Sequence, residues 1–432
     1  MNWKTAILII IAPCLLGVGG AIYYAGVLPH YETDTGSQHP VVPGDGTNTS
    51  VPSPTNLAEL VNASNLFALE MYSNLTNAND NLFFSPYSIF TALGMTYEGA
   101  RNKTADEIRS VFHFPADNQT RWSLFKALIE KLNAGKTGCN LSTANAMWVQ
   151  QGFPLLQAYL DALQTYYKSG AFDVDFVHAL EESRLRINYW VENQTNGKIK
   201  DLIPQGVLDG LTALVLTNAI YFKGDWLKQF NASLTEERDF HAASGATVKA
   251  RMMARSDEES KFNYTSVDGI QVLEMPYSGE KLSMLVLLPK EGSMESLERT
   301  LTLKKLGEWR GKLEEQRVDI YFPKFELKTK YFLKENLSGM GMPSAFSGAS
   351  DLSGMAGRPG DLYIKEVIHQ GFVSVDENGT EAAAATAVVV ELRGPVEPAV
   401  PVFNADHPFM FLIQDRETGN ILFMGKLADP AK

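Results

Sequence analysis

Residues 377–398, ENGTEAAAATAVVVELRGPVEP, form the segment that most restricts what this chain can fold into. The EAAAATA portion has high helix propensity, but the three valines at 388–390 oppose a continuing helix. A single arginine then leads into a stretch that contains prolines. We interpret the segment as one that starts on the surface and is built to enter a sheet as a strand.

Residues 377–393 separate into two distinct faces when they are placed in an extended strand, because neighbouring side chains then point to opposite sides. One face carries only small, apolar or threonine side chains: Thr380, Ala382, Ala384, Thr386, Val388, Val390 and Leu392. The opposite face carries Glu381, Ala383, Ala385, Ala387, Val389 and Glu391. A slip of one residue would bury both glutamates, and Gly379 supplies a hinge with free backbone dihedrals. The first face is therefore suited to insertion above a core.

Arg393 is the only lysine or arginine in residues 377–415. A trypsin-like protease recognises such a side chain through an aspartate in its primary pocket, so we predict cleavage of the Arg393-Gly394 bond. Two alternatives stay open. Leu392 would favour a chymotrypsin-like or subtilisin-like protease, and cleavage at Val390 would favour an elastase-like protease.

The composition predicts a large folded core and argues against nucleic acid as a partner. The chain of 432 residues is 45% hydrophobic, carries a formal net charge of -12 and has no long basic run, whereas phosphate binding needs clustered lysine and arginine. It contains no H-E-x-x-H or G-x-S-x-G motif, and its 7 histidines are scattered. We therefore predict a protein that is not an enzyme and has no catalytic residues, no metal site and no cofactor.

The N-terminal residues 1–28 predict export. Residues 6–28 are apolar and uncharged, which is enough chain to span a bilayer as a helix. Either they are an uncleaved signal-anchor or they are a cleaved signal peptide; the long apolar run and the lack of an A-x-A site favour the anchor. Residues 29–55 are rich in Pro, Gly, Ser and Thr and predict a disordered stalk. We expect residues 56–432 to form one extracellular domain, either membrane-anchored or secreted.

The cysteines and glycosylation sequons fit this location. Cys14 lies in the apolar segment, so Cys139 has no partner for an intrachain disulfide in the exported part, and we expect it to be an inert thiol. Asparagines in N-x-[ST] sequons predict a glycoprotein, and they stand at Asn48, Asn62, Asn74, Asn102, Asn118, Asn140, Asn193, Asn231, Asn263, Asn336 and Asn378.

The order of patterns predicts an α+β domain, with helices mostly first and strands mostly second. Residues 81–100 begin extended, turn at Ser85-Pro86 and continue as a buried helix. The almost wholly apolar residues 211–222 predict a strand that is buried on both faces. Residues 407–427 predict a hairpin that turns at residues 416–419.

Taken together, these segments resemble the serpin family. The stretch 377–387 resembles the hinge of the family's reactive-centre loop. Further stretches resemble other family motifs in the same order along the chain, namely 81–108, 187–204, 214–226 and 405–413. The resemblance implies a serpin fold, with three β-sheets, about eight to nine helices and an exposed reactive-centre loop.

The resemblance also implies a mechanism and a set of site residues. A serine protease cuts the loop and forms an acyl-enzyme, and the cut loop then inserts into sheet A, the family's main sheet, and traps the protease. By the family's spacing, the hinge Glu377 leads to the reactive bond between Arg393 and Gly394. The hinge comprises Glu377, Gly379, Thr380, Glu381, Ala382, Ala383, Ala384 and Ala385. The polar shutter beneath sheet A comprises Ser85, Ser88, Asn218 and His369, and Trp226 marks the breach where the hinge enters.

The small hinge residues favour an inhibitor of trypsin-like serine proteases that acts as a monomer. A non-inhibitory serpin, cut at the loop without trapping its protease, is the alternative, because a glycan on Asn378 within the hinge would obstruct insertion. An adhesion module on a stalk is a third reading. Scattered lysines at Lys324, Lys328, Lys330 and Lys334 form no patch that predicts activation by a polyanion.

Overall fold

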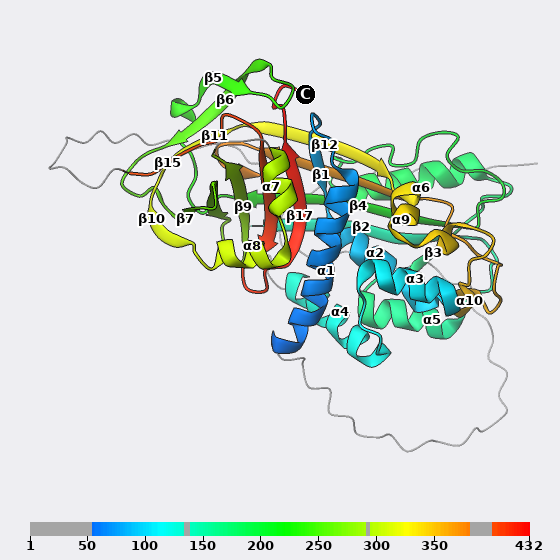
Figure 1. Cartoon of the computed structure of the whole chain (residues 1–432). Coiled ribbons are helices and arrows are strands. Elements are labelled where there is room, and N and C mark those ends of the chain that lie inside the picture. The colour runs from blue at the N-terminus through cyan, green and yellow to red at the C-terminus, as the bar shows by residue number, and fades with distance from the viewer. Residues whose placement is uncertain (1–53, 134–138, 291–293, 381–399) are drawn as a thin grey trace, which may run out of the picture. The chain divides into compact units, whose positions relative to one another are not determined.

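The computed structural model describes residues 54–133, 139–290, 294–380 and 400–432 (Figure 1). The predicted membrane or signal segment lies outside these residues, as does the predicted stalk apart from Pro54 and Thr55, with which the first helix begins. In the described part of the chain, no helix is long and apolar enough to cross a membrane.

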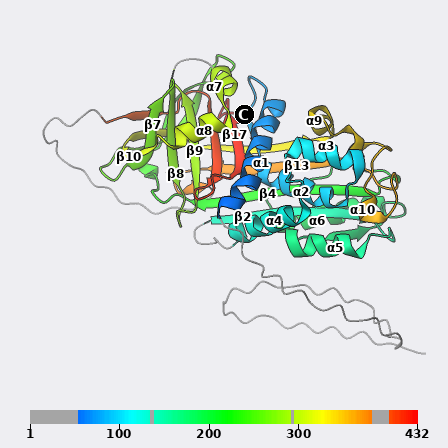
Figure 2. The ribbon, with the colours of Figure 1, turned by 60° about the horizontal axis from the view of Figure 1, so that its bottom comes forward.

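A six-stranded sheet, called the central sheet from here on, carries the candidate site. Its strand order is β12-β13-β14-β4-β2-β3. The strands are β2 (Cys139–Gln150), β3 (Ala171–Val174), β4 (Leu214–Asp225), β12 (Phe325–Phe332), β13 (Val367–Val375) and β14 (Gly379–Thr380). Figure 2 shows β13, β4 and β2 running side by side. Strands β13 and β4 pair in parallel over most of their length, and the short β14 lies between them at one end.

Two further sheets complete the β structure, so the three predicted sheets are confirmed. The seven-stranded sheet has the order β1-β17-β16-β9-β8-β7-β10 and the four-stranded sheet has the order β15-β11-β6-β5. Their strands are β1 (Leu82–Phe84), β5 (Glu236–His241), β6 (Thr247–Arg255), β7 (Lys261–Val267), β8 (Ile270–Pro276), β9 (Leu282–Pro289), β10 (Glu314–Arg317), β11 (Asp319–Pro323), β15 (Val402–Asn404), β16 (Phe409–Asp415) and β17 (Ile421–Leu427). The predicted C-terminal hairpin is the antiparallel pair β16 and β17.

The described residues contain ten α-helices, slightly more than the eight to nine expected, because several are shorter than two turns. They are α1 (Pro54–Leu75), α2 (Pro86–Gly99), α3 (Asn102–Phe112), α4 (Asn118–Asn133), α5 (Gln157–Ala162), α6 (Leu180–Gln194), α7 (Met294–Thr300), α8 (Leu303–Arg310), α9 (Lys334–Met340) and α10 (Ser353–Ala356). A π-helical turn, η1 (Leu163–Tyr167), extends α5, and 3₁₀ turns lie at η2 (Ala232–Leu234) and η3 (Pro343–Phe346).

The start of α2 follows the sequence prediction. Ser85 caps the helix, since its side chain accepts a hydrogen bond from the backbone N–H of Ser88, and Pro86 occupies the first helical turn, where its missing N–H costs nothing. Almost every residue of α2 is buried. This helix runs beneath the central sheet and presents its first turn to β13 and β4.

Apolar side chains pack on both faces of the central sheet, which explains the mainly apolar sequence of β4. On one face the sheet shares a large core with α1 to α4 and with the seven-stranded sheet. On the other face, outward side chains such as Val215, Tyr221 and Phe372 pack against Ile187 and Val191 of α6. The strand begins at Leu214 and not at Leu211, which lies before it and is 81% exposed. From Leu214 to Phe222 every residue is buried, as a strand between two cores requires.

A buried ion pair ties the helices beneath the sheet together. The guanidinium of Arg121 donates two hydrogen bonds of 2.9 Å to the two carboxylate oxygens of Glu98. Trp122 Nε1 and the Tyr167 hydroxyl donate to the same carboxylate, at 2.7 Å each. The network therefore joins α2, α4 and η1 through one carboxylate.

We predict that replacing Glu98 by Ala destabilises the fold strongly. The change leaves the Arg121 cation buried without its partner, and breaking a buried pair in this way costs about 3–5 kcal/mol. Equilibrium denaturant unfolding measures the loss. The control is Glu130→Ala, because Glu130 is half exposed and lies 3.6 Å from Lys168 in a surface pair that is worth less than about 1 kcal/mol. Equal effects of the two changes would contradict a structural role for the buried network.

Candidate functional site

The hinge of the predicted loop lies inside the central sheet. Strand β14 pairs antiparallel with both of its neighbours: Thr380 lies opposite Val375 of β13 and opposite Gly224 of β4. Gly379 lies opposite Asp225, and a Cβ atom there would stand 2.2 Å from the backbone oxygen of Gly224. Only glycine permits this close approach. Within the predicted segment 377–393, Gly379 and Thr380 thus already occupy strand positions, whereas Glu377 and Asn378 lie in the turn before them.

Trp226, predicted at the breach, holds the turn that leads into β14. Its backbone N–H donates to the Asn378 carbonyl at 2.7 Å, and its indole Nε1 donates to the Asp376 carbonyl at 3.0 Å. The indole stacks on Tyr277, with ring centroids 4.7 Å apart. The Tyr277 hydroxyl in turn hydrogen-bonds the buried Thr380 hydroxyl at 3.0 Å. Two aromatic rings therefore form the inner wall of the entrance to the sheet.

Glu377 ties the turn to the neighbouring strands. Its largely buried carboxylate accepts hydrogen bonds from Lys324 Nζ at 2.6 Å and from the Thr235 hydroxyl at 2.7 Å. Burial raises the pKa of Glu377, but the hydrogen bonds from Lys324 and Thr235 outweigh it, so the pKa lies below its usual value. The carboxylate therefore stays charged and paired at neutral pH.

The four predicted shutter residues contact one another where β13 and β4 lie over α2. His369 and Asn218 are directly opposite each other in the parallel pairing. The backbone N–H of Ser85 donates to His369 Nε2 at 3.0 Å, so Nδ1 carries the ring proton and donates to Asn218 Oδ1. Asn218 Nδ2 donates to the Ser88 hydroxyl. This chain of hydrogen bonds closes the seam between the two strands from below.

Sequence reasoning missed several of the contacting residues. Asn145 of β2 accepts hydrogen bonds from the Ser88 hydroxyl at 3.0 Å and from Asn218 Nδ2 at 2.8 Å, and so belongs to the shutter. The local signal for it was an amide side chain in the middle of β2. The roles of Tyr277 and Thr235 have no local sequence signal, because both contacts join segments more than a hundred residues apart.

The remaining predicted site residues lie outside the described part of the chain. The reactive bond, Arg393 and Gly394, is among them, as are the hinge residues Glu381, Ala382, Ala383, Ala384 and Ala385. Their roles stay predictions.

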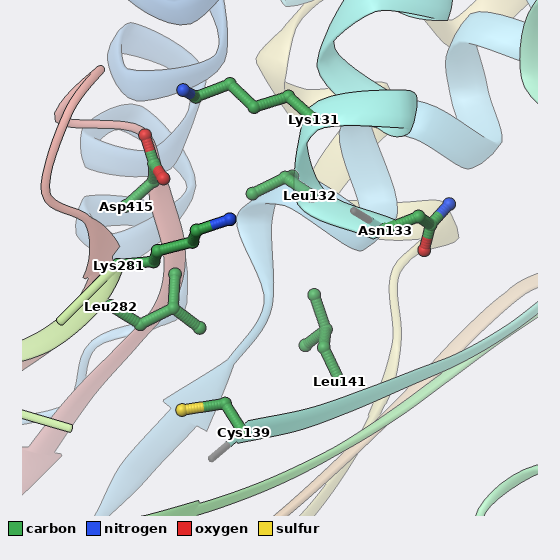
Figure 3. Close-up of a pocket in the computed structure, with 8 residues that line it drawn as sticks. All are labelled: Lys131, Leu132, Asn133, Cys139, Leu141, Lys281, Leu282 and Asp415. Carbon is green, nitrogen blue, oxygen red and sulfur yellow. The ribbon is translucent and has the colours of Figure 1, made fainter. Parts of the chain in front are cut away.

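Cys139 and the pocket beside it offer no chemistry. Burial raises the pKa of the Cys139 thiol to about 12, which keeps it protonated and unreactive at neutral pH. Figure 3 shows the pocket, formed by Lys131, Leu132, Asn133, Cys139, Leu141, Lys281, Leu282 and Asp415. Its volume of about 30 Å³ is on the scale of a single water molecule. In the described residues, no group of three or more histidine, cysteine, aspartate or glutamate side chains is arranged to hold a metal ion.

Comparison with known proteins decides the family. A sequence model described as "Serpin (serine protease inhibitor)" matches residues 62–430. The chain belongs to the serpin family. The predicted membership and the predicted fold are thereby confirmed, and the central sheet is the sheet A of this family.

Individual relatives of this serpin come from distant organisms. It is 45% identical over 373 residues to an uncharacterized serpin-like protein of Thermococcus kodakarensis, covering 86% of each chain. It is 39% identical to the leukocyte elastase inhibitor of Xenopus laevis, covering 87% of this chain and 100% of the relative. The crystal structure of uncleaved ovalbumin superimposes with a TM-score of 0.77 at 30% identity, covering 86% of this chain and 100% of ovalbumin. The family as a whole is described as one of serine protease inhibitors.

The shutter predicts a specific loss of stability in acid. Complete burial lowers the pKa of His369 to about 3, against 6.5 in the unfolded chain. Because the pKa of His369 is lower in the folded state, the unfolded chain takes up a proton first as the pH falls. The free energy of unfolding therefore keeps its full value above pH 6.5 and falls by about 1.4 kcal/mol per pH unit between 6.5 and 3. We expect His369→Gln to remove this slope between pH 6.5 and 4.5, measured by denaturant unfolding at several pH values. Equal slopes in the two proteins would contradict a neutral buried histidine.

Proposed function

We propose that this serpin inhibits a trypsin-like serine protease by offering Arg393-Gly394 as the reactive bond and inserting the cut loop as a new strand between β13 and β4. The observation that carries the proposal is β14: Thr380 is already paired with both of these strands, and Gly379 is paired with β4. The seam has the groups that insertion requires, an entrance beside Trp226 at one end and the polar shutter at His369 in its middle.

The register of β14 supports a defined path for the rest of the loop. Continued residue by residue, the antiparallel pairing brings Thr386 opposite both Asn218 and His369. Side chains alternate along a strand, so in the inserted loop Thr386 would face the same side as Thr380, towards Tyr277 and the core. Its hydroxyl would then reach the shutter at the point where insertion separates Asn218 from His369.

The same register supports the assignment of the charged face. Glu381 would lie opposite Lys223 of β4, and both side chains would point away from the core. The alanines that follow would pass between β4 and β13 with the smallest possible side chains. The sequence pattern and the strand register, which are independent of each other, therefore favour the same insertion geometry.

The location and specificity belong to the same proposal. We propose that residues 1–28 export the domain 56–432, either as an anchor or as a cleaved signal, so that a monomer acts on an extracellular protease. A specificity for chymotrypsin-like or subtilisin-like proteases through Leu392 is the alternative, and a serpin that is cut without inhibiting is the other.

Incubation with trypsin tests the inhibition directly. With excess serpin we expect a complex that survives denaturing electrophoresis, and a released peptide that begins at Gly394 by intact mass. Arg393→Ala should abolish this complex, while the control Glu391→Gln leaves Arg393 in place and should retain it. Clean cleavage at Arg393 with trypsin still active would contradict inhibition. A stable complex with chymotrypsin, cut after Leu392, but none with trypsin would point to the alternative protease class.

The role proposed for Thr386 is tested after the loop has been cut. Thr386→Val should destabilise the cleaved protein by about 1–3 kcal/mol, since it leaves Asn218 or His369 without a buried hydrogen-bond partner. The uncut protein should keep its stability, and Thr386→Ser should behave as the original chain does. Denaturant unfolding of cut and uncut protein measures both states. A cleaved Thr386→Val protein as stable as the original would contradict the proposed register.

A further inference from the structure

The chain between α6 and β4, residues 195–213, crosses the outer face of the central sheet, and we call it the connector. Its apolar side chains Ile199, Leu202 and Ile203 are fully buried. They share a core with the outward side chains of β4 and β13, including Tyr221 and Phe372. The connector therefore covers the side of the seam that faces α6.

On the β4 side, the connector is fastened to α6. The side-chain amide of Asn188 exchanges two hydrogen bonds with the backbone of Ile203, at 2.9 and 2.8 Å. Arg184 donates to the Ile203 carbonyl at 2.7 Å. The connector then runs directly into β4. These contacts do not cross the seam between β4 and β13.

On the other side, three lysine contacts tie the connector to β12 and β13 across the seam. Lys198 Nζ lies 5.3 Å from the centre of the Phe372 ring of β13. Lys330 of β12 donates to the Asp201 carbonyl at 2.6 Å. Lys365, two residues before β13, forms an ion pair of 2.7 Å with Asp209. We call these three contacts the lysine clasp.

The pair of Lys365 and Asp209 is the firmest part of the clasp because Asp209 is held in place. Asp209 Oδ1 accepts hydrogen bonds from the Leu211 backbone N–H at 3.0 Å and from the Thr212 hydroxyl at 3.1 Å. Its other oxygen, Oδ2, points to Lys365. The hydrogen bond from Lys365 lowers the pKa of Asp209, so the pair is charged at neutral pH. The pair thus links the entry to β4 with the entry to β13.

We propose that the lysine clasp sets the rate at which the cleaved loop enters the sheet. An added strand would move β4 and β13 apart by one strand spacing, about 4.8 Å. Lys365 and Asp209, now 2.7 Å apart, would then be too far apart to remain paired in their present positions. Full insertion therefore breaks the bond between Lys365 and Asp209. Its part in inhibition rests on the proposed function, because insertion competes there with hydrolysis of the acyl-enzyme.

The rate at which a free peptide inserts into the central sheet measures the effect of the lysine clasp in the absence of a protease. A synthetic peptide with the sequence of residues 381–392 is added to the uncut full chain, and incorporation is followed by native electrophoresis. We expect Lys365→Met and Asp209→Asn each to incorporate the peptide roughly two- to fivefold faster, as the loss of a partly exposed ion pair allows. Asp209→Asn keeps the oxygen that accepts from Leu211 and Thr212, so the turn is retained.

The double variant and a neighbouring lysine provide the controls. Because the two residues act through one bond, Lys365→Met with Asp209→Asn should be no faster than either single change. Lys328→Met should leave the rate unchanged, since Lys328 is an exposed lysine on the same strand as Lys330. Unchanged rates in both single variants, or additive effects in the double variant, would overturn the proposal.

The number of serpin molecules consumed per trypsin molecule separates this proposal from the proposed function. If the original chain traps trypsin, Lys365→Met should lower that number, and an unchanged number despite faster peptide insertion would overturn the role in timing. The original chain could instead be cut without trapping trypsin, while the rates of peptide insertion still depend on Lys365 and Asp209. That result would contradict the proposed inhibition and support the role of the lysine clasp in strand insertion.

Discussion

The hydrogen bond between His369 and Asn218 is the interaction on which the rest of the site depends. It joins β13 and β4 in the middle of their parallel pairing, directly above the first turn of α2. Ser85 fixes the tautomer of the histidine from below, and Ser88 and Asn145 hold the asparagine. Residues 367–372 of β13 and 216–221 of β4 are also paired through their backbones, so opening the seam breaks this pairing together with the side-chain bond.

The two ends of the seam differ in what holds them. At the entrance, β14 already separates the strands, and Glu377, Lys324 and Thr235 hold the turn that precedes it. At the far end, the strands are in direct contact and the connector bridges them through lysine side chains. Insertion would therefore proceed from an open end, through a polar middle, to a clasped end. A different set of contacts therefore controls insertion at each of these three positions.

Much of the fold was predictable because its signals are local. The apolar run 211–222 predicted a doubly buried strand, and Ser85-Pro86 predicted the start of α2. Ser85, Ser88, Asn218 and His369 came from the family resemblance and from no property of their own. Asn145, Tyr277 and Thr235 could not be predicted in their roles, since each acts through a contact between distant segments. The alternation in residues 377–393 predicted which face enters the core, but only the pairing of β14 gives the register.

The central claim is that the cut loop becomes a strand between β13 and β4, and the most direct test is the stability of the protein before and after a single cut at Arg393. An added strand satisfies backbone groups along both seam edges, so the account predicts a much higher guanidinium concentration at the unfolding midpoint for the cut chain than for the uncut chain. A midpoint that is unchanged or lower after cutting would mean that the loop does not enter the sheet, and would contradict the account.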